Sequence, residues 1–225
     1  MAPMPDKSQA LRDEYHRRFG GRAEYRDAVW KVLCRDFFSR YIPSTSAVLD
    51  LGAGWGEFTR NVVAREKYAM DLNPETGRRV AGFAKFLQQD CSQRWPLDDA
   101  GLDVVFTSNF LEHLPSKEAI EATLREAARC LKPGGTMVCL GPNIRYTGGA
   151  YWDFWDHYIP LTHVSMAEAL ELNGLRVREN VPRFLPFTMS GNRETPIFMV
   201  RAYLRLPFAW PLFGQQFLVV ASKAP

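Results

Sequence analysis

Residues 48–56 constrain the fold more than any other part of the chain. A short apolar run, typical of a strand, leads directly into three spaced glycines, Gly52, Gly54 and Gly56, and residues 57–63 can form a helix. Glycine has no Cβ, so it permits a tight turn and lets a ligand approach the backbone closely. The helix would present free N–H groups and a partial positive charge. This order predicts a ligand-binding loop at the carboxyl end of a parallel strand.

The spacing and the charges of this loop exclude the common phosphate sites. A dinucleotide fingerprint needs Gly-x-Gly-x-x-Gly, and counted from Gly52 its last glycine would fall at Glu57. A P-loop needs Gly-Lys-Ser/Thr, which does not occur here. Asp50 and Glu57 place an acidic residue on each side of the loop. These charges would repel a polyphosphate and attract a ligand with a cationic group.

The pattern Asp-x-Gly-x-Gly-x-Gly resembles the first motif of the class I S-adenosylmethionine-dependent methyltransferases. That cofactor carries an ammonium and a sulfonium and no phosphate, which suits the acidic loop. The alternative is a glycine-rich turn that binds no ligand. The resemblance assigns five loop residues to the cofactor site: Asp50, Gly52, Ala53, Gly54 and Gly56.

Acidic residues at later strand ends extend the resemblance over residues 47–142. The resemblance implies that Asp71, at the end of a second strand, accepts both ribose hydroxyls. It implies that Asp90, after a third strand, accepts a hydrogen bond from the adenine amino group, and that the N–H of Cys91 faces the ring. Leu72 and Asn109, the latter at the end of a fourth strand, are assigned to the same site.

Strands and helices alternate along the chain, which predicts a parallel sheet covered on both faces. The expected fold is α/β, Rossmann-like, with seven mostly parallel strands, helices on both faces and an antiparallel last strand. Expected helices lie at 57–65, 74–81, 117–131, 165–173 and about 196–206. Expected strands begin near 48 and continue at 67–72, 86–91, 103–109, 136–140, 175–184 and 216–222.

We expect a single methyltransferase domain over residues 1–225. Its parts are an amino-terminal helical lid (1–43), a cofactor-binding core (44–142), an aromatic acceptor loop (143–164) and the carboxyl-terminal part of the sheet (165–225), with an insertion at 185–214. The lid would hold two helical stretches broken at Gly20-Gly21, and the second carries an apolar stripe at Val29, Leu33 and Phe37.

Composition narrows the classes of partner. The net charge of +3 comes without a lysine-rich run, so no nucleic-acid partner is expected. The four cysteines form no C-x-x-C pair, which predicts free thiols and no metal site. The start lacks the apolar core of a signal peptide, and no apolar run is long enough for a membrane span. The expected location is cytoplasmic, and the sequence leaves a homodimer open.

The acceptor loop is unusually aromatic. Tyr151, Trp152, Trp155 and Tyr158 are candidate acceptor-binding residues, because their rings offer broad apolar faces with polar edges to a sugar or an aromatic acceptor. Two alternatives stay open: a small core beneath a long loop, and a cover over the cofactor. An aromatic cage for an amine acceptor is a further possibility.

Three histidines are candidate general bases. His157 is the first candidate because Asp156 beside it could orient the ring, and His163 is the second. His113, just after the fourth strand, is the third. The alternative is that all three anchor loops, since methyl transfer from a sulfonium depends mainly on alignment and on the exclusion of water.

Residues 197–218 are rich in apolar side chains and carry Arg201 and Arg205. They could form an amphipathic element at a membrane surface or the wall of a lipid pocket. The favoured interpretation is a helix packed on the sheet edge or at a dimer interface, because two arginines are few for membrane binding.

The predicted function is S-adenosylmethionine-dependent methyl transfer to an oxygen or nitrogen of a small metabolite or saccharide. One alternative is a lipid-linked acceptor at a membrane surface, and another is a binding module without catalysis. Residues 108–111, Ser-Asn-Phe-Leu, lack the Asn/Asp-Pro-Pro-Tyr/Phe motif typical of enzymes that methylate base or glutamine nitrogens. The sequence does not identify the acceptor.

Overall fold

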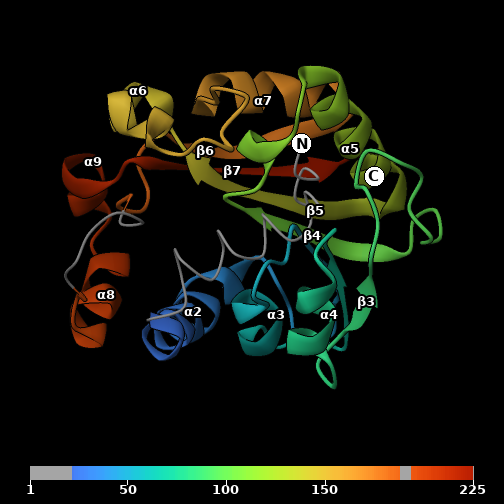
Figure 1. The fold of residues 1–225 in the computed structure, drawn as a ribbon, viewed down its shortest axis with the longest axis horizontal. Coiled ribbons are helices and arrows are strands. Elements are labelled where there is room, and N and C mark those ends of the chain that lie inside the picture. The colour runs from blue at the N-terminus through green and yellow to red at the C-terminus, as the bar shows by residue number, and fades with distance from the viewer. Residues whose placement is uncertain (1–21, 188–193, 225) are drawn as a thin grey trace, which may run out of the picture.

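The computed structural model describes residues 22–187 and 194–224. Its centre is a seven-stranded sheet in the order β3-β2-β1-β4-β5-β7-β6 (Figure 1). The strands are β1 (Ala47–Leu51), β2 (Glu66–Met70), β3 (Lys85–Leu87), β4 (Leu102–Ser108), β5 (Leu131–Pro142), β6 (Leu175–Val181) and β7 (Gln216–Lys223). β7 pairs antiparallel with both β5 and β6, and the other pairs are parallel. The predicted fold class is confirmed.

Helices cover both faces of this sheet, as Figure 1 shows. One face carries α5 (Lys117–Cys130) and α7 (His163–Leu172), with α6 (Ile144–Thr147) beside them. The other carries α2 (Ala23–Asp36), α3 (Glu57–Asn61) and α4 (Pro74–Val80). Between β6 and β7 lie α8 (Ile197–Leu204) and α9 (Trp210–Phe213). Short 3-10 turns are η2 (Phe38–Arg40), η3 (Leu111–His113), η4 (Gly148–Asp153) and η5 (Pro207–Ala209).

Alternation within β1 explains the two cores. Every residue of β1 is buried. Leu49 and Leu51 face the cluster that includes α5 and α7, whereas Val48 faces the cluster that includes α2 and α3. Successive side chains of a strand point to opposite faces, so a strand covered on both sides is apolar throughout. Asp50 is the exception, and it lies at the site described below.

Local capping signals set the helix boundaries. The Ser116 side chain accepts from the Ala119 N–H at the start of α5, and Asn73 accepts from the Glu75 N–H at the start of α4. α3 is shorter than expected: it ends at Asn61, because Val62 adopts an extended conformation with ψ 137°.

The apolar stripe predicted before the first strand packs into the core. Leu33 and Phe37 are buried, and the Trp30 ring contacts Phe58 and Phe106 edge-on. Helix α2 is therefore a structural layer on one face of the sheet. The rest of the predicted lid, residues 1–21 with the Gly20-Gly21 break, lies outside the described residues. No helix within the described ranges is long and apolar enough to cross a membrane.

Candidate functional site

The glycine loop after β1 is held against the end of β2. The N–H groups of Gly52 and Ala53 donate to the Met70 carbonyl at 2.9 and 3.1 Å. The next peptide is held by two side chains: the Gly54 N–H donates to Asp71 Oδ2 at 2.8 Å, and the Gly54 carbonyl accepts from Thr76 Oγ1 at 2.6 Å. The loop backbone is therefore fixed before any ligand binds.

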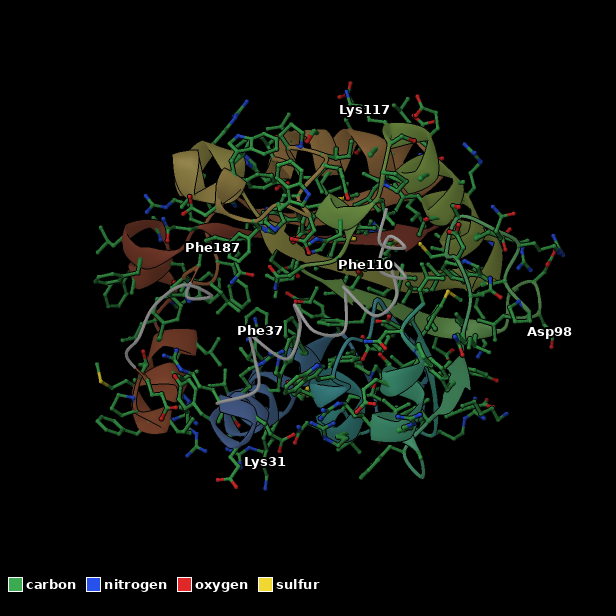
Figure 2. The ribbon with its side chains drawn as sticks, in the orientation of Figure 1. Lys31, Phe37, Asp98, Phe110, Lys117 and Phe187 are labelled. Atoms are coloured by element: carbon green, nitrogen blue, oxygen red, sulfur yellow. The ribbon has the colours of Figure 1, made fainter. Side chains whose placement is uncertain are left out.

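Glycine is required at two loop positions for a steric reason as well. Gly52 and Gly56 both have φ +74°, which disfavours other residues. A Cβ at Gly52 would lie 2.1 Å from Phe110 Cγ, and one at Gly56 would lie 2.5 Å from Val80 Cγ1. Phe110, labelled in Figure 2, follows β4, so the end of β4 closes directly over the loop.

Asp50 lies behind the loop rather than on its open side. Its carboxylate is buried and accepts from Thr59 Oγ1 at 2.5 Å. Burial raises the pKa of Asp50 to about 7, the Thr59 hydrogen bond opposes this rise, and the charges of Asp71 and Glu57 add to it. Asp50 can attract a cation through its field, but it presents no exposed oxygen here.

Asp71 occupies the position that the sequence indicates for a ribose. Oδ2 accepts from the Gly54 N–H, and Oδ1 accepts from the Asn73 N–H at 2.8 Å. Each carboxylate oxygen has two acceptor sites, so the backbone donors of Gly54, Asn73 and Leu72 leave the carboxylate with acceptor capacity for a ligand hydroxyl. Burial raises the pKa of Asp71, against the lowering effect of these backbone donors. Leu72 beside it is exposed.

Asp90 and Cys91 follow the short strand β3. Asp90 is exposed, and its Oδ1 accepts from both the N–H and the hydroxyl of Ser92 at 2.8 Å. Cys91 is buried: its sulfur accepts from the Thr123 hydroxyl, and its carbonyl accepts from the Trp95 indole. Burial raises the pKa of the Cys91 thiol to about 11. All four cysteines are free, as predicted, and buried.

Asn109, at the end of β4, carries an unsatisfied buried acceptor. Its backbone is left-handed with φ +49°, its N–H donates to the Leu140 carbonyl at 2.9 Å, and its Nδ2 donates to Ser108 Oγ. Its Oδ1 is buried and has no hydrogen-bond partner. Such a group is rare and costly, which points to a ligand donor at this place. With Asp71, this amide oxygen fits a ligand that carries hydroxyl and ammonium donors.

The aromatic segment 143–164 divides into a buried part and an exposed part. Tyr151 is fully buried, and its hydroxyl donates to the Ile159 carbonyl. It therefore belongs to a small core beneath the loop, not to an open pocket wall. Trp152, Trp155 and Tyr158 are 53%, 92% and 54% exposed. The exposed rings stay available to an acceptor.

His113 joins this segment to the end of β4. Its Nδ1 lies 2.9 Å from the Asp156 carbonyl and 3.3 Å from Asp156 Oδ2. Burial alone would lower the pKa of His113, but the hydrogen bond to Asp156 and the charges of Glu112 and Asp156 raise it overall. Burial raises the pKa of Glu112, whose carbonyl accepts from the Tyr158 N–H at 2.9 Å.

Of the other two candidate bases, His157 is less accessible than His113, whereas His163 is only partly buried. His157 is only 8% exposed and packs against the rings of His113, Tyr151 and Phe154. His163 begins α7, and its Nδ1 lies 2.9 Å from Nδ2 of the buried Asn143. The structure thus brings His113 and His157 together, with ring centroids 4.9 Å apart.

One group of side chains could hold a metal ion, within the part of the chain that is described. Donor atoms of Glu112, His113 and His157 lie within 4.8 Å of one another. The sequence predicted no metal, because its cysteines form no C-x-x-C pair, and it did not indicate this group, since His157 lies far along the chain from the other two. This spread exceeds the distance between adjacent ligands of a formed site, so the three side chains make a cluster rather than a preformed metal centre.

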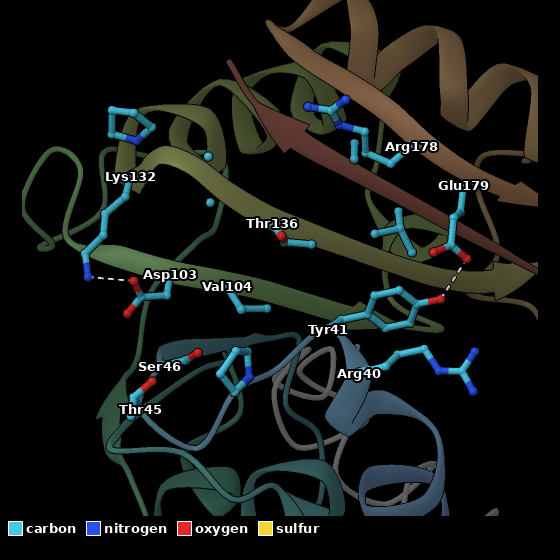
Figure 3. Close-up of a pocket in the computed structure, with 16 residues that line it drawn as sticks. Arg40, Tyr41, Thr45, Ser46, Asp103, Val104, Lys132, Thr136, Arg178 and Glu179 are labelled. Carbon is cyan, nitrogen blue, oxygen red and sulfur yellow. Dashed lines mark hydrogen bonds and ion pairs between the residues drawn. The ribbon is translucent and has the colours of Figure 1, made fainter. Parts of the chain in front are cut away.

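A separate depression of about 520 Å³ lies at the opposite edge of the sheet (Figure 3). It is lined by residues at the amino ends of β4 and β5. Its acids are already engaged: Asp103 binds Lys132 at 2.6 Å, and Glu179 accepts from Tyr41 at 2.8 Å. Parallel sheets bind ligands at the carboxyl ends of their strands, so this depression is not the site predicted from the sequence.

Sequence reasoning did not single out three residues that shape the site. Thr59 binds Asp50, Thr76 binds the loop carbonyl, and Phe110 covers Gly52. Asn73-Pro74 was a readable signal for the start of α4, which places Thr76 in its first turn. No local pattern reveals the contacts of Thr59 and Phe110, because the first depends on how α3 packs on β1 and the second on how β1 and β4 pair.

Comparisons with known proteins agree with this geometry. Residues 49–139 match the family described as a methyltransferase domain. The chain is 29% identical over 195 residues to a methyltransferase-like protein of Schizosaccharomyces pombe; the match covers 84% of this chain and 66% of the relative's length.

Two solved structures share the fold. One is a Haloferax volcanii methyltransferase in complex with the Trm112 activator, with a TM-score of 0.68 and 21% identity over 99% of this chain and 100% of that chain. The other is a SAM-dependent methyltransferase from Archaeoglobus fulgidus, with a TM-score of 0.66 and 21% identity over 97% and 100% of the two chains. At this identity they support the fold alone.

Proposed function

This chain belongs to the class I S-adenosylmethionine-dependent methyltransferases, and we propose that it methylates an oxygen or nitrogen atom of a small metabolite or a saccharide. The observation that carries the cofactor part is the unsatisfied Asn109 Oδ1 at the same sheet edge as the free acceptor sites of Asp71. When bound, S-adenosylmethionine supplies a methyl group activated by its sulfonium.

We assign the cofactor contacts residue by residue. Asp71 would hold the ribose hydroxyls with the acceptor capacity that its backbone donors leave. Asn109 Oδ1 would accept from the ammonium group, and the buried negative charge of Asp50 would favour that cation from behind the loop. Asp90 keeps Oδ2 for the adenine amino group, since its Oδ1 is used by Ser92.

The acceptor site is proposed beside the exposed rings of the 143–164 segment. Trp152, Trp155 and Tyr158 present flat apolar faces on a polar protein surface, which is the arrangement that stacks against a sugar or an aromatic ring. A nucleic-acid acceptor is not proposed, because the net charge is only +3 and comes without a basic run.

We propose His113 as the general base in place of His157. Its Nδ1 is held by Asp156, which fixes the tautomer and leaves Nε2 to accept a proton. The His113 side chain is 29% exposed, whereas His157 is nearly buried. His157 then supports the position of the His113 ring from the side, through their edge-to-face contact.

A screen of acceptors with methyl-labelled cofactor tests the function directly. The purified chain should label at least one saccharide or small hydroxyl or amine compound, and the Asp71→Ala variant should label it much more slowly when the cofactor concentration is low. The Haloferax volcanii neighbour was solved with the Trm112 activator. If the purified chain labels an acceptor without any other protein, it does not require a protein activator.

A further inference from the structure

An exposed apolar surface runs along the segment that separates β6 from β7. We call it the apolar ridge, and it consists of Phe198, Met199, Leu206, Phe208, Leu212 and Phe213, which are 72%, 49%, 40%, 73%, 69% and 63% exposed. Residues 195–214 contain two charged side chains, Arg201 and Arg205, and no acidic one. Exposed apolar patches of this kind mark interaction surfaces.

Helix α8 is apolar on both of its sides. Ile197, Val200 and Leu204 pack toward the core that includes α2. This inward side agrees with the interpretation of a helix packed on the sheet edge. The outward side carries Phe198 and Met199, which that packing does not use. Apart from Arg201 and Tyr203 the helix is apolar, and an exposed apolar side that the fold does not cover is typical of an interaction surface.

The segment that carries the ridge is packed against the rest of the protein, so the exposure of the ridge does not come from a loose segment. The Trp210 ring contacts Phe37 and Phe184 at 5.8 and 5.0 Å. Arg183 donates from Nε to the Gly214 carbonyl at 2.7 Å, and Tyr203 donates to the Phe184 carbonyl at 2.6 Å. The inward side chains are thus packed in the core, and the outward ones are exposed to solvent.

We propose that the apolar ridge docks on an anionic phospholipid bilayer. Phenylalanine, leucine and methionine beside arginine form the pattern that enters the boundary between headgroups and acyl chains. Arg205 is exposed at the end of α8, and Arg201 is bound to Asp36 at 2.9 Å. Asp36 thus neutralises Arg201, and Arg205 is the arginine of α8 and its end that stays available to an anionic headgroup.

The ridge lies at the edge of the sheet that carries the candidate site. β7 begins at Gln216, which pairs with Pro142 at the carboxyl end of β5. In Figure 1, α8 and α9 lie on the same side of the molecule as α6. The Phe154 and Phe187 rings, 5.7 Å apart, join the aromatic loop to the chain that leads to α8. Docking would therefore bring the acceptor loop to the lipid surface, where an acceptor carried by lipid would be reached.

Vesicle flotation without cofactor or acceptor tests this proposal independently of the proposed function. We expect the wild type to float with vesicles of phosphatidylcholine and phosphatidylglycerol and less with phosphatidylcholine alone. Phe208→Ser/Phe213→Ser should lower the partition coefficient about tenfold or more, because two inserted rings are lost. Arg205→Glu should weaken binding to the anionic vesicles only. Leu172→Ser, at a position 77% exposed on α7, is the matched control and should bind like the wild type.

Three results would overturn the proposal. The first is that the wild type does not float with anionic vesicles and stays in the buffer fraction. The second is a folded Phe208→Ser/Phe213→Ser variant that floats like the wild type. The third combines two measurements: the wild type does not float, and light scattering finds it as a dimer whereas the double variant is a monomer. That result would make the ridge a dimer interface.

Discussion

The Gly54 N–H donates to Asp71 Oδ2 at 2.8 Å, so the loop after β1 takes its shape from the carboxylate after β2. Asp71 Oδ1 meanwhile fixes the turn into α4 through the Asn73 N–H. One side chain thus sets the two backbone segments that border the proposed cofactor site and keeps acceptor capacity for the ligand. A change at Asp71 should affect loop geometry and ligand contact together.

Asp71→Ala is expected to weaken binding of S-adenosylmethionine by about 1–3 kcal/mol, roughly tenfold to a hundredfold, because ribose hydrogen bonds and the loop anchor are lost. Titration calorimetry measures this effect for both the cofactor and its demethylated product. Asp98→Ala is the control, since Asp98 is an exposed acid at the right-hand edge of the molecule in Figure 2. If a folded Asp71→Ala protein bound S-adenosylmethionine as tightly as the wild type, the assignment of Asp71 to the ribose would be wrong.

Asn109→Gly is expected to separate affinity from stability. Glycine accepts the left-handed backbone at this position, and the unsatisfied buried oxygen disappears, so the free energy of unfolding should stay within about 1 kcal/mol of the wild type. Cofactor affinity should fall about tenfold if Oδ1 is a ligand acceptor. Thermal unfolding and calorimetry on the same samples check both values. A large loss of stability with unchanged affinity would mean that Asn109 is structural.

Asp50→Asn is expected to change how stability depends on pH. The folded pKa of about 7 lies above the ordinary value of 3.8, so the folded state holds this proton more tightly than the unfolded state. Stability therefore falls as pH rises from about 4 to 7 and then levels off. The Asn variant can still accept from Thr59 and lacks this fall, so its advantage over the wild type should grow from pH 5 to pH 8.

Melting temperatures at pH 5, 6, 7 and 8 give the measurement, with Asp103→Asn as a control whose pKa is lowered rather than raised. A cationic ligand favours the ionised form of Asp50, so the affinity of the wild type for S-adenosylmethionine should rise across the same range. A constant difference in melting temperature between wild type and Asp50→Asn would show that Asp50 does not titrate there.

The sheet and the loop could be predicted from the sequence because both depend on local patterns. Apolar runs that end in Gly52, Asp71 and Asn109 indicate parallel strands whose carboxyl ends meet. The interior of the site could not be predicted in the same way. Whether Asp50 is buried depends on where Thr59 lies once α3 has packed, and the sequence shows only that both residues are present.

The aromatic segment marks a second limit of sequence reasoning. Tyr151 and Trp155 belong to one run of rings without a helical or strand period, so no pattern tells which ring points inward. The structure buries Tyr151 completely and leaves Trp155 92% exposed. The choice among the histidines changed for a similar reason: Asp156 is adjacent to His157 in sequence, yet it holds His113.

The contact between Asp156 and His113 should set the pH dependence of the rate. Because Asp156 raises the pKa of His113, a base at His113 would be neutral only above that raised value, and the rate would increase with pH through it. Asp156→Asn removes the negative charge, so the rising limb of the pH–rate profile should move to lower pH. His113→Asn should lower kcat about 10²–10⁴-fold for a hydroxyl acceptor, with cofactor affinity nearly unchanged. Asp153→Asn, an exposed acid in the same loop, is the matched control and should keep the wild-type profile. If His113→Asn lost only a few-fold in kcat, alignment alone would account for catalysis, and His113 would be an anchor of the acceptor loop.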